Sequence, residues 1–148
     1  MNNYPEWWSD TLTIYNKFVD PQTDIVTWYR TVVENCFWKD VGSKLLIGNV
    51  TLDGNYIICR VPIDDRYLDA GDWRNVPNDQ MSNYFTFQPD DIVIKGEVDD
   101  VVDEGIPGKR SSDLIKKYKK LGSCMQVDTL CNNTGPGRGN EHYSVKGI

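Results

Sequence analysis

Runs of β-branched and aromatic residues, broken by short polar segments, dominate the first third of the chain. The runs cover residues 11–18 and 25–33, and the polar segment Asp20-Pro-Gln-Thr23 lies between them. Residues of these types favour strands, and a polar segment that contains proline favours a turn. The pattern predicts an antiparallel hairpin that opens an all-β domain.

Two features extend this pattern toward residue 62. Residues 35–39 continue the second strand past Glu34-Asn35, where we expect a bulge. Residues 50–52 and 56–61 flank Asp53-Gly54-Asn55, and Asp-Gly is the strongest short hairpin signal in the chain. We therefore predict a second hairpin over residues 50–61, with Pro62 at its end.

The strand pattern is lost between Ile63 and Gln80, where polar residues surround isolated large apolar ones. A long excursion in a compact domain is usually functional or mobile. Its residues Tyr67, Leu68 and Trp73 predict packing, either on the chain's own barrel or on a neighbour. After it, residues 84–87 and 92–98 are predicted strands, and residues 99–108 are a predicted exposed acidic loop.

The chain contains one convincing helix, at about residues 111–121. A serine caps its start, Asp113 lies in its first turn, lysines crowd its last turn and Gly122 follows it. Its apolar residues recur at helical spacing and predict one buried stripe, made of Leu114, Ile115, Tyr118 and Leu121. Residues 124–130 and 142–145 are predicted closing strands around the glycine-rich loop at 132–140.

Together these elements predict a mainly β protein. We expect a small β-barrel or sandwich of about six to eight antiparallel strands, with the short helix and several long loops. The 148 residues are predicted to form one domain, with an N-terminal extension at residues 1–10 and a long loop at residues 63–80.

Charge and composition narrow the classes of function. The net charge of −6 argues against a surface that grips nucleic acid through bulk positive charge. An acidic protein can still line a path for DNA, because repulsion of the phosphates lets a duplex slide. No apolar run reaches the roughly 20 residues that span a bilayer, and no secretory signal is visible, so we expect cytosolic synthesis and reduced cysteines.

Catalytic and metal chemistry find little support in the sequence. The single histidine, His142, has no nucleophile motif beside it and reads as a packing or surface residue. The four cysteines lack the close ligand pairs of a zinc site, and the acidic clusters lack the alternation of a calcium loop. The glycine-rich segment 135–139 is not a phosphate-binding loop, since no Gly-Lys-Ser/Thr follows it. We expect no catalytic residue, no bound metal and no cofactor.

Two groups of residues are candidates for contact with partners. Lysines of the predicted helix form the main basic cluster of an acidic chain, and they also suit the C-terminal end of a helix dipole. Large aromatic residues outside the strands suit burial in an interface. The candidates are Trp7, Trp8, Tyr67, Trp73, Lys116, Lys117, Lys119 and Lys120.

The order of the elements resembles the head–tail joining proteins of tailed bacteriophages, the head-closure or stopper class. The resemblance lies in Thr13-Ile14-Tyr15 of the first strand, in the aromatic end of the second strand at 36–38, and in Asp90-Asp-Ile-Val-Ile-Lys-Gly96. Nearly the whole chain is also similar to a group of minor structural proteins from phages and prophages of Gram-positive gut bacteria. The motifs shared with that group begin at Asn35 (Asn-Cys-Phe-Trp), Pro77 (Pro-Asn-Asp-Gln-Met-Ser), Lys95 (Lys-Gly-Glu-Val-Asp-Asp) and Arg110 (Arg-Ser-Ser-Asp-Leu-Ile).

This resemblance implies a structural protein of the virion neck, assembled in the cytoplasm of a bacterial host. It would form a homo-oligomeric ring of about 12 copies, or about six on the tail side. The ring would bind the portal or adaptor and the tail, and packaged double-stranded DNA would pass through it without sequence-specific contact. The resemblance implies no membrane partner. We expect the loop with Asp99, Asp100, Asp103 and Glu104 to face the channel.

Other functions stay open at this point. Within the same particle, the chain could be a tail-completion or tail-terminator protein, or a minor capsid protein. Outside that class, an unrelated β-barrel that binds a ligand or carbohydrate through its aromatic residues is the main competitor. Assembly into rings favours the first group, whereas a monomer with a deep aromatic pocket favours the second.

Overall fold

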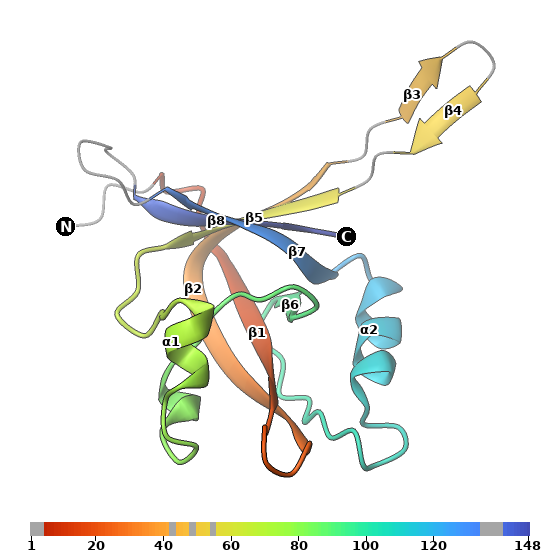
Figure 1. Cartoon of the computed structure of the whole chain (residues 1–148). Helices are drawn as coiled ribbons and strands as arrows, with labels where there is room; N and C mark the ends of the chain where they lie inside the picture. Colours follow the sequence, from red (N-terminus) through yellow and green to blue (C-terminus); the bar gives the residue numbers. More distant parts are fainter. Residues whose placement is uncertain (1–4, 42–43, 48–49, 54–55, 134–140) are drawn as a thin grey trace.

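A closed barrel of six antiparallel strands forms the body of the protein (Figure 1). The structure is a computed structural model that describes residues 5–41, 44–47, 50–53, 56–133 and 141–148, with the backbone alone for 44–47, 50–53 and 133. Around the barrel the strand order is β1-β2-β5-β8-β7-β6, and β6 pairs with β1 to close it. The predicted fold class, a small β-barrel with a short helix and long loops, is confirmed.

The secondary structure elements follow in chain order. The strands are β1 (Asp10–Val19), β2 (Val26–Val41), β3 (Lys44–Ile47), β4 (Val50–Asp53), β5 (Tyr56–Pro62), β6 (Ile92–Lys95), β7 (Cys124–Asn133) and β8 (His142–Gly147). The helices are α1 (Ala70–Arg74), the 3-10 turn η1 (Met81–Asn83) and α2 (Ser111–Lys119).

The predicted opening hairpin is confirmed in β1 and β2. The two strands pair antiparallel from Val19↔Val26 to Leu12↔Val33, and the register then shifts before Asp10↔Cys36. The predicted bulge lies at this shift, where Asn35 adopts a left-handed backbone with φ 59°. The bulge bends β2, so its second half leaves β1 and pairs with β5 instead.

Side chains from all six strands fill the barrel interior. Leu12, Trp38, Cys59, Met125 and Val145 are among the buried residues of this cluster. Because side chains alternate across a strand, their neighbours in sequence point outward from the barrel. The barrel is therefore a packed core and not a channel.

Helix α2 covers one side of the barrel, over β6 and β1 (Figure 1). Leu114 and Tyr118 are buried against Tyr15 and Ile94, as the predicted stripe requires. Leu121, however, is 72% exposed, because the helix ends at Lys119 and the chain turns away at Gly122, where φ is 68°. Its inclusion in the apolar stripe was wrong.

The start of α2 also differs from the prediction. No serine side chain caps it. The carboxylate of Asp113 accepts the backbone N–H of Arg110 at 3.1 Å, and Glu104 accepts the N–H of Ser111 at 3.0 Å. A carboxylate near the first turn satisfies a backbone donor that the helix leaves open and suits the positive end of its dipole.

The excursion between residues 63 and 80 packs on the chain's own barrel. Trp73 of α1 is fully buried, with its ring 6.1 Å from Phe18 and 5.9 Å from Tyr29. Its Nε1 donates to the carbonyl of Tyr84 at 3.3 Å. The excursion is thus a second, smaller cluster at the far end of the β1–β2 hairpin, on the face that continues from the barrel interior, and one tryptophan anchors it.

Strands β3 and β4 form a separate two-stranded sheet, which we call the arm. Figure 1 shows the arm leaving the barrel where β2 ends and β5 begins. The prediction that residues 50–61 form a hairpin is wrong, because β4 pairs with β3 and β5 pairs with β2 and β8. Residues 54 and 55 of the predicted turn lie outside the described residues.

The C-terminal half follows the predictions in part: β6 ends at Lys95 and not at residue 98, and β7 runs to Asn133, two residues into the predicted loop. Strands β7 and β8 pair antiparallel as expected, and the residues 134–140 of the loop between them lie outside the described part of the chain. Residues 84–87 form no regular strand; Phe85 makes only an isolated bridge with Tyr67. Large aromatic residues at alternate positions made this segment look like a strand. In the structure Phe85 and Phe87 are buried in the barrel core without regular strand pairing.

Candidate functional site

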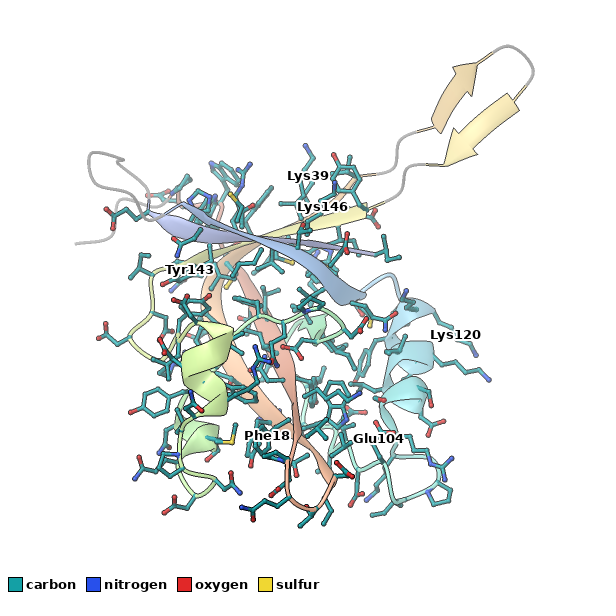
Figure 2. All side chains as sticks on the ribbon, viewed as in Figure 1. Phe18, Lys39, Glu104, Lys120, Tyr143 and Lys146 are labelled. Atoms are coloured by element: carbon teal, nitrogen blue, oxygen red, sulfur yellow. The ribbon has the colours of Figure 1, made fainter. Side chains whose placement is uncertain are left out.

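The outer face of the sheet formed by β2, β5, β8 and β7 carries a second basic cluster in this acidic molecule, besides the lysines of α2. The register aligns two rows of outward residues across the four strands: Phe37, Arg60, Ser144 and Cys131 in one row, and Lys39, Ile58, Lys146 and Thr129 in the next. These rows hold three cations and no carboxylate. Figure 2 shows Lys39 and Lys146 on the upper side of the sheet, with Tyr143 on the opposite side.

Aromatic rings accompany these cations. The guanidinium carbon of Arg60 lies 5.5 Å from the ring centre of Phe37, and the ammonium of Lys146 lies 4.3 Å from that of Tyr56. Trp7, which is 59% exposed, packs edge-on against Phe37 at 5.0 Å. We call Trp7, Phe37, Lys39, Tyr56, Arg60 and Lys146 the basic face. None of its three cations forms an ion pair in the described part of the chain.

A groove of about 730 Å³ adjoins the basic face. The N-terminal segment, the β2 bulge and the segment after β5 form its walls, and Trp8 separates it from Phe37, with the two rings stacked at 6.4 Å. Its charged lining residues are Glu6, Glu34, Asp64, Arg66 and Glu97.

The groove has a net negative charge. Arg66 donates to Asp64 through Nε at 3.0 Å and Nη2 at 2.7 Å, and these bonds hold the pKa of the Asp64 carboxyl below its usual value. The Arg66 guanidinium therefore neutralises the Asp64 carboxylate, one of the four carboxylates that line the groove. Glu6, Glu34 and Glu97 form no ion pair within the described ranges, so three negative charges face the groove.

The acidic loop after β6 is tied to the barrel and to α2. Asp100 accepts Tyr118 Oη at 2.6 Å and Lys117 Nζ at 2.9 Å, while its carbonyl accepts Tyr15 Oη at 2.7 Å. Partial burial raises the pKa of the Asp100 carboxyl, but the bonds from Tyr118 and Lys117 outweigh it and hold the pKa below its usual value. Glu104 binds Trp28 Nε1 and the N–H of Ser111, both at 3.0 Å.

Asp100 and Glu104 are therefore internal ties of the loop, and the position of the loop toward a channel stays a prediction. Asp99 and Asp103 are exposed. Of the helix lysines, Lys117 is paired with Asp100, whereas Lys116, Lys119 and Lys120 are exposed. Figure 2 shows Lys120 pointing away from the barrel.

The aromatic candidates separate into buried and exposed residues. Trp73 is wholly internal and Trp8 is buried, so their candidate role as partner contacts is wrong in this structure. Tyr67 is half-buried and packs against Tyr143, with ring centres 4.0 Å apart and ring planes tilted by 35°. Among the four aromatic candidates, Trp7, Trp8, Tyr67 and Trp73, only Trp7 has a mostly exposed side chain.

A buried polar network joins β1 to the segment before β6. The Asp91 carboxylate accepts Asn16 Nδ2 at 2.7 Å and the N–H groups of Lys17 and Gln88, each at 3.0 Å. Asn16 also donates to the carbonyl of Thr86 at 2.6 Å. Burial raises the pKa of Asp91 to about 6, against the lowering effect of these bonds. The network fixes the chain before β6 and offers no open site for a substrate.

His142 and three of the four cysteines have packing roles in the structure. His142 packs edge-on against Trp8 at 5.4 Å. Cys36, Cys59 and Cys124 are buried thiols, and burial raises the pKa of Cys36 to about 12 and that of Cys124 to about 11. Among the described residues, no group of three or more His, Cys, Asp or Glu side chains is placed to hold a metal ion.

No helix in the described ranges is long and apolar enough to cross a membrane.

Sequence reasoning did not find the basic face. Lys39 follows Phe37 by two residues, as one face of a strand requires, and this signal was available. Arg60 and Lys146 join them only through the pairing of β2, β5 and β8, which local patterns do not reveal.

The fold and the site define a small antiparallel β-barrel protein that carries an arm, a basic face and an acidic groove. The chain belongs to DUF6751, a family of unknown function that matches residues 8–148. No curated protein and no solved structure matches the chain.

Proposed function

We propose that this protein is a structural, ring-forming component of a phage neck, of the head-closure class, that bridges the portal or adaptor and the tail. The sequence resemblance suggests the particle. The structural observation that supports an assembly role is the arm on a closed barrel. A closed barrel uses every strand edge internally, so it cannot join other copies by extending its sheet.

The arm has the opposite property. A lone two-stranded sheet is only marginally stable in water, and its outer edges present unpaired backbone groups. Within the described ranges, β3 and β4 pair with each other and with no barrel strand. A segment of this kind gains stability when it lies against another protein, which suits a subunit that sits between two neighbouring rings.

The charge of the molecule suits the same role. A ring of copies with a net charge of −6 each would repel the phosphates of packaged DNA and let the duplex pass. The exposed carboxylates of Asp99 and Asp103 are the loop residues that we propose for the channel wall. A tail-terminator or minor capsid position would use the same features at another level of the particle.

The experiment that tests this proposal is to tag the chain in its native host, purify it gently and image the product by negative-stain electron microscopy. We expect rings, portals or tailed particles that carry the tag at the neck. A tag at the tail end or on the capsid shell would move the protein to the runner-up positions. A bare monomer without viral proteins would overturn the proposal and direct attention to ligand binding by the aromatic residues.

An arm-less variant provides the matched control. It retains the barrel, so it should accumulate normally in the host, yet the proposal requires that it enter particles poorly. Full incorporation without the arm would show that the arm has no role in assembly.

A further inference from the structure

The basic face is an unusual surface for this molecule. It places Lys39, Arg60 and Lys146 on one side of a sheet with no carboxylate in their two rows, although the chain has a net charge of −6. Lys39 and Lys146 are exposed and Arg60 is half-buried, and cations of this kind without an ion pair are typical of a surface that receives an anionic partner.

The same chain carries a surface of matching charge. The groove beside Trp8 holds the carboxylates of Glu6, Glu34 and Glu97, which have no cationic partner in the described part of the chain. Three cations on one surface and three carboxylates on another are complementary in sign and number. The groove is open, so long side chains such as those of Lys39 and Arg60 can enter it.

We infer that the basic face of one copy docks on the acidic groove of a second copy. Each copy has one face and one groove that share a border, so copies can pair about a two-fold axis or continue from copy to copy until a ring closes, and native mass spectrometry counts the copies in the assembly. Trp7 lies at the border of the two surfaces, where an exposed aromatic ring becomes the apolar centre of the contact. The inference deepens the proposed function, since it names the contact between subunits of the ring.

Nucleic acid is the other anionic partner that such a face could receive, and the observations favour it less. Proteins that bind DNA with useful affinity neutralise many phosphates. The face has three cations, two of which already contact aromatic rings, within a molecule that is acidic overall.

The test is a charge exchange between copies of the full chain, measured by analytical ultracentrifugation and native mass spectrometry. One variant combines Lys39→Glu with Lys146→Glu on the face, and the other combines Glu6→Lys with Glu34→Lys in the groove. Alone, each variant should self-associate at least about 10-fold more weakly than the natural chain, because like charges then face each other. When mixed, the two should associate again, since each reversed surface meets its complement.

Matched controls carry the same charge change elsewhere. Lys95→Glu with Lys109→Glu changes exposed residues at the end of β6 and in the loop before α2, and Asp72→Lys with Asp79→Lys changes exposed residues in and after α1. These variants should associate like the natural chain. Circular dichroism and thermal melting of every variant confirm that it is folded. Association of the natural chain should also weaken as salt rises, because salt screens exposed charges.

Three outcomes would overturn the inference. The natural chain could remain a monomer at a concentration on the order of 100 µM. The face and groove variants could associate as well as the natural chain, or fail to recover when mixed. Finally, the face variant could lose binding of a duplex or single-stranded oligonucleotide while self-association is unchanged, which would assign the face to nucleic acid. None of these results depends on the location of the protein in a particle, which the imaging experiment decides separately.

Discussion

Asp91 is a fully buried carboxylate that holds the segment before β6 against β1. Its pKa is raised from 3.8 to about 6, so between these values the folded chain binds a proton that the unfolded chain releases. The stabilisation that results is fully present below pH 4 and is lost as the pH rises through 6.

This pH-dependent stabilisation can be measured by comparing the free energy of unfolding of the natural chain with that of the Asp91→Asn variant. The natural chain should gain relative to the variant as the pH falls from 7 to 4, by up to about 3 kcal/mol for a change of two pKa units. Urea titrations followed by tryptophan fluorescence at several pH values measure it. Asp90→Asn, at the exposed neighbour, is the control. A difference that stays constant or shrinks toward pH 4 would contradict the assignment.

Trp73 and Trp7 form a natural pair for testing which aromatic residues stabilise the single chain. Trp73→Ala should cost about 3–5 kcal/mol of stability, because it leaves a cavity beside Phe18 and Tyr29 and releases α1. Trp7→Ala should cost less than about 1 kcal/mol, since its ring is mostly exposed. Chemical denaturation of both variants checks this. Equal losses would mean that the N-terminal segment belongs to the core.

At the scale of elements, Gly147 is the β8 residue that pairs with Val127 of β7 without room for a side chain. A Cβ at this position would run into the carbonyl oxygen of Gln126 and would lie 2.7 Å from Met125 Cγ. Only a residue without a side chain fits here, because both neighbours belong to the barrel wall and its core.

We therefore expect Gly147→Ala to lower the free energy of unfolding by about 1–3 kcal/mol, as overpacking of a core does. The matched control is Gly71→Ala in α1, where no atom lies within 4 Å of the added Cβ and alanine favours the helix. Gly71→Ala should be neutral or slightly stabilising. Thermal melting of both variants decides, and a neutral Gly147→Ala would show that β7 and β8 are less tightly packed.

The elements that local signals specify could be predicted from the sequence, whereas the pairing of distant strands could not. The opening hairpin and α2 follow from residue types, turn chemistry and the Gly122 stop. The Asp53-Gly54 signal was misleading, because a turn residue does not identify the strand that pairs across it, and β4 pairs backward with β3.

The candidate site shows the same limit. Phe37 and Lys39 are visible as one face of a strand, but Lys146 reaches them only through two strand pairings across a hundred residues. Trp73 was expected to face either the barrel or a partner, and its sequence context could not decide between them. Its burial depends on the position of the excursion over β1 and β2, which is a property of the tertiary structure.

At the scale of the whole molecule, the arm and the barrel are separable. Val41 and Tyr56 are register partners where the arm leaves the barrel, so a two-residue turn can join them directly. Replacing residues 42–55 by Asn-Gly, which favours tight hairpin turns, should leave the melting temperature within a few degrees of the natural value. Calorimetry measures it, and a large loss of stability would mean that the arm supports the barrel.

Strand β8 lies between β5 and β7, and it is the last barrel strand in chain order. At a synthesis rate of about 5–20 residues per second, these 148 residues take roughly 7–30 s. The edges of β5 and β7 that pair with β8 stay unpaired until residues 142–147 have been made. A translation product that stops early has an unclosed barrel and lacks Lys146, one of the cations of the basic face. If the basic face is the docking surface that we propose, a copy that stops before residue 142 has neither the closed barrel nor the full surface, so both depend on the same strand.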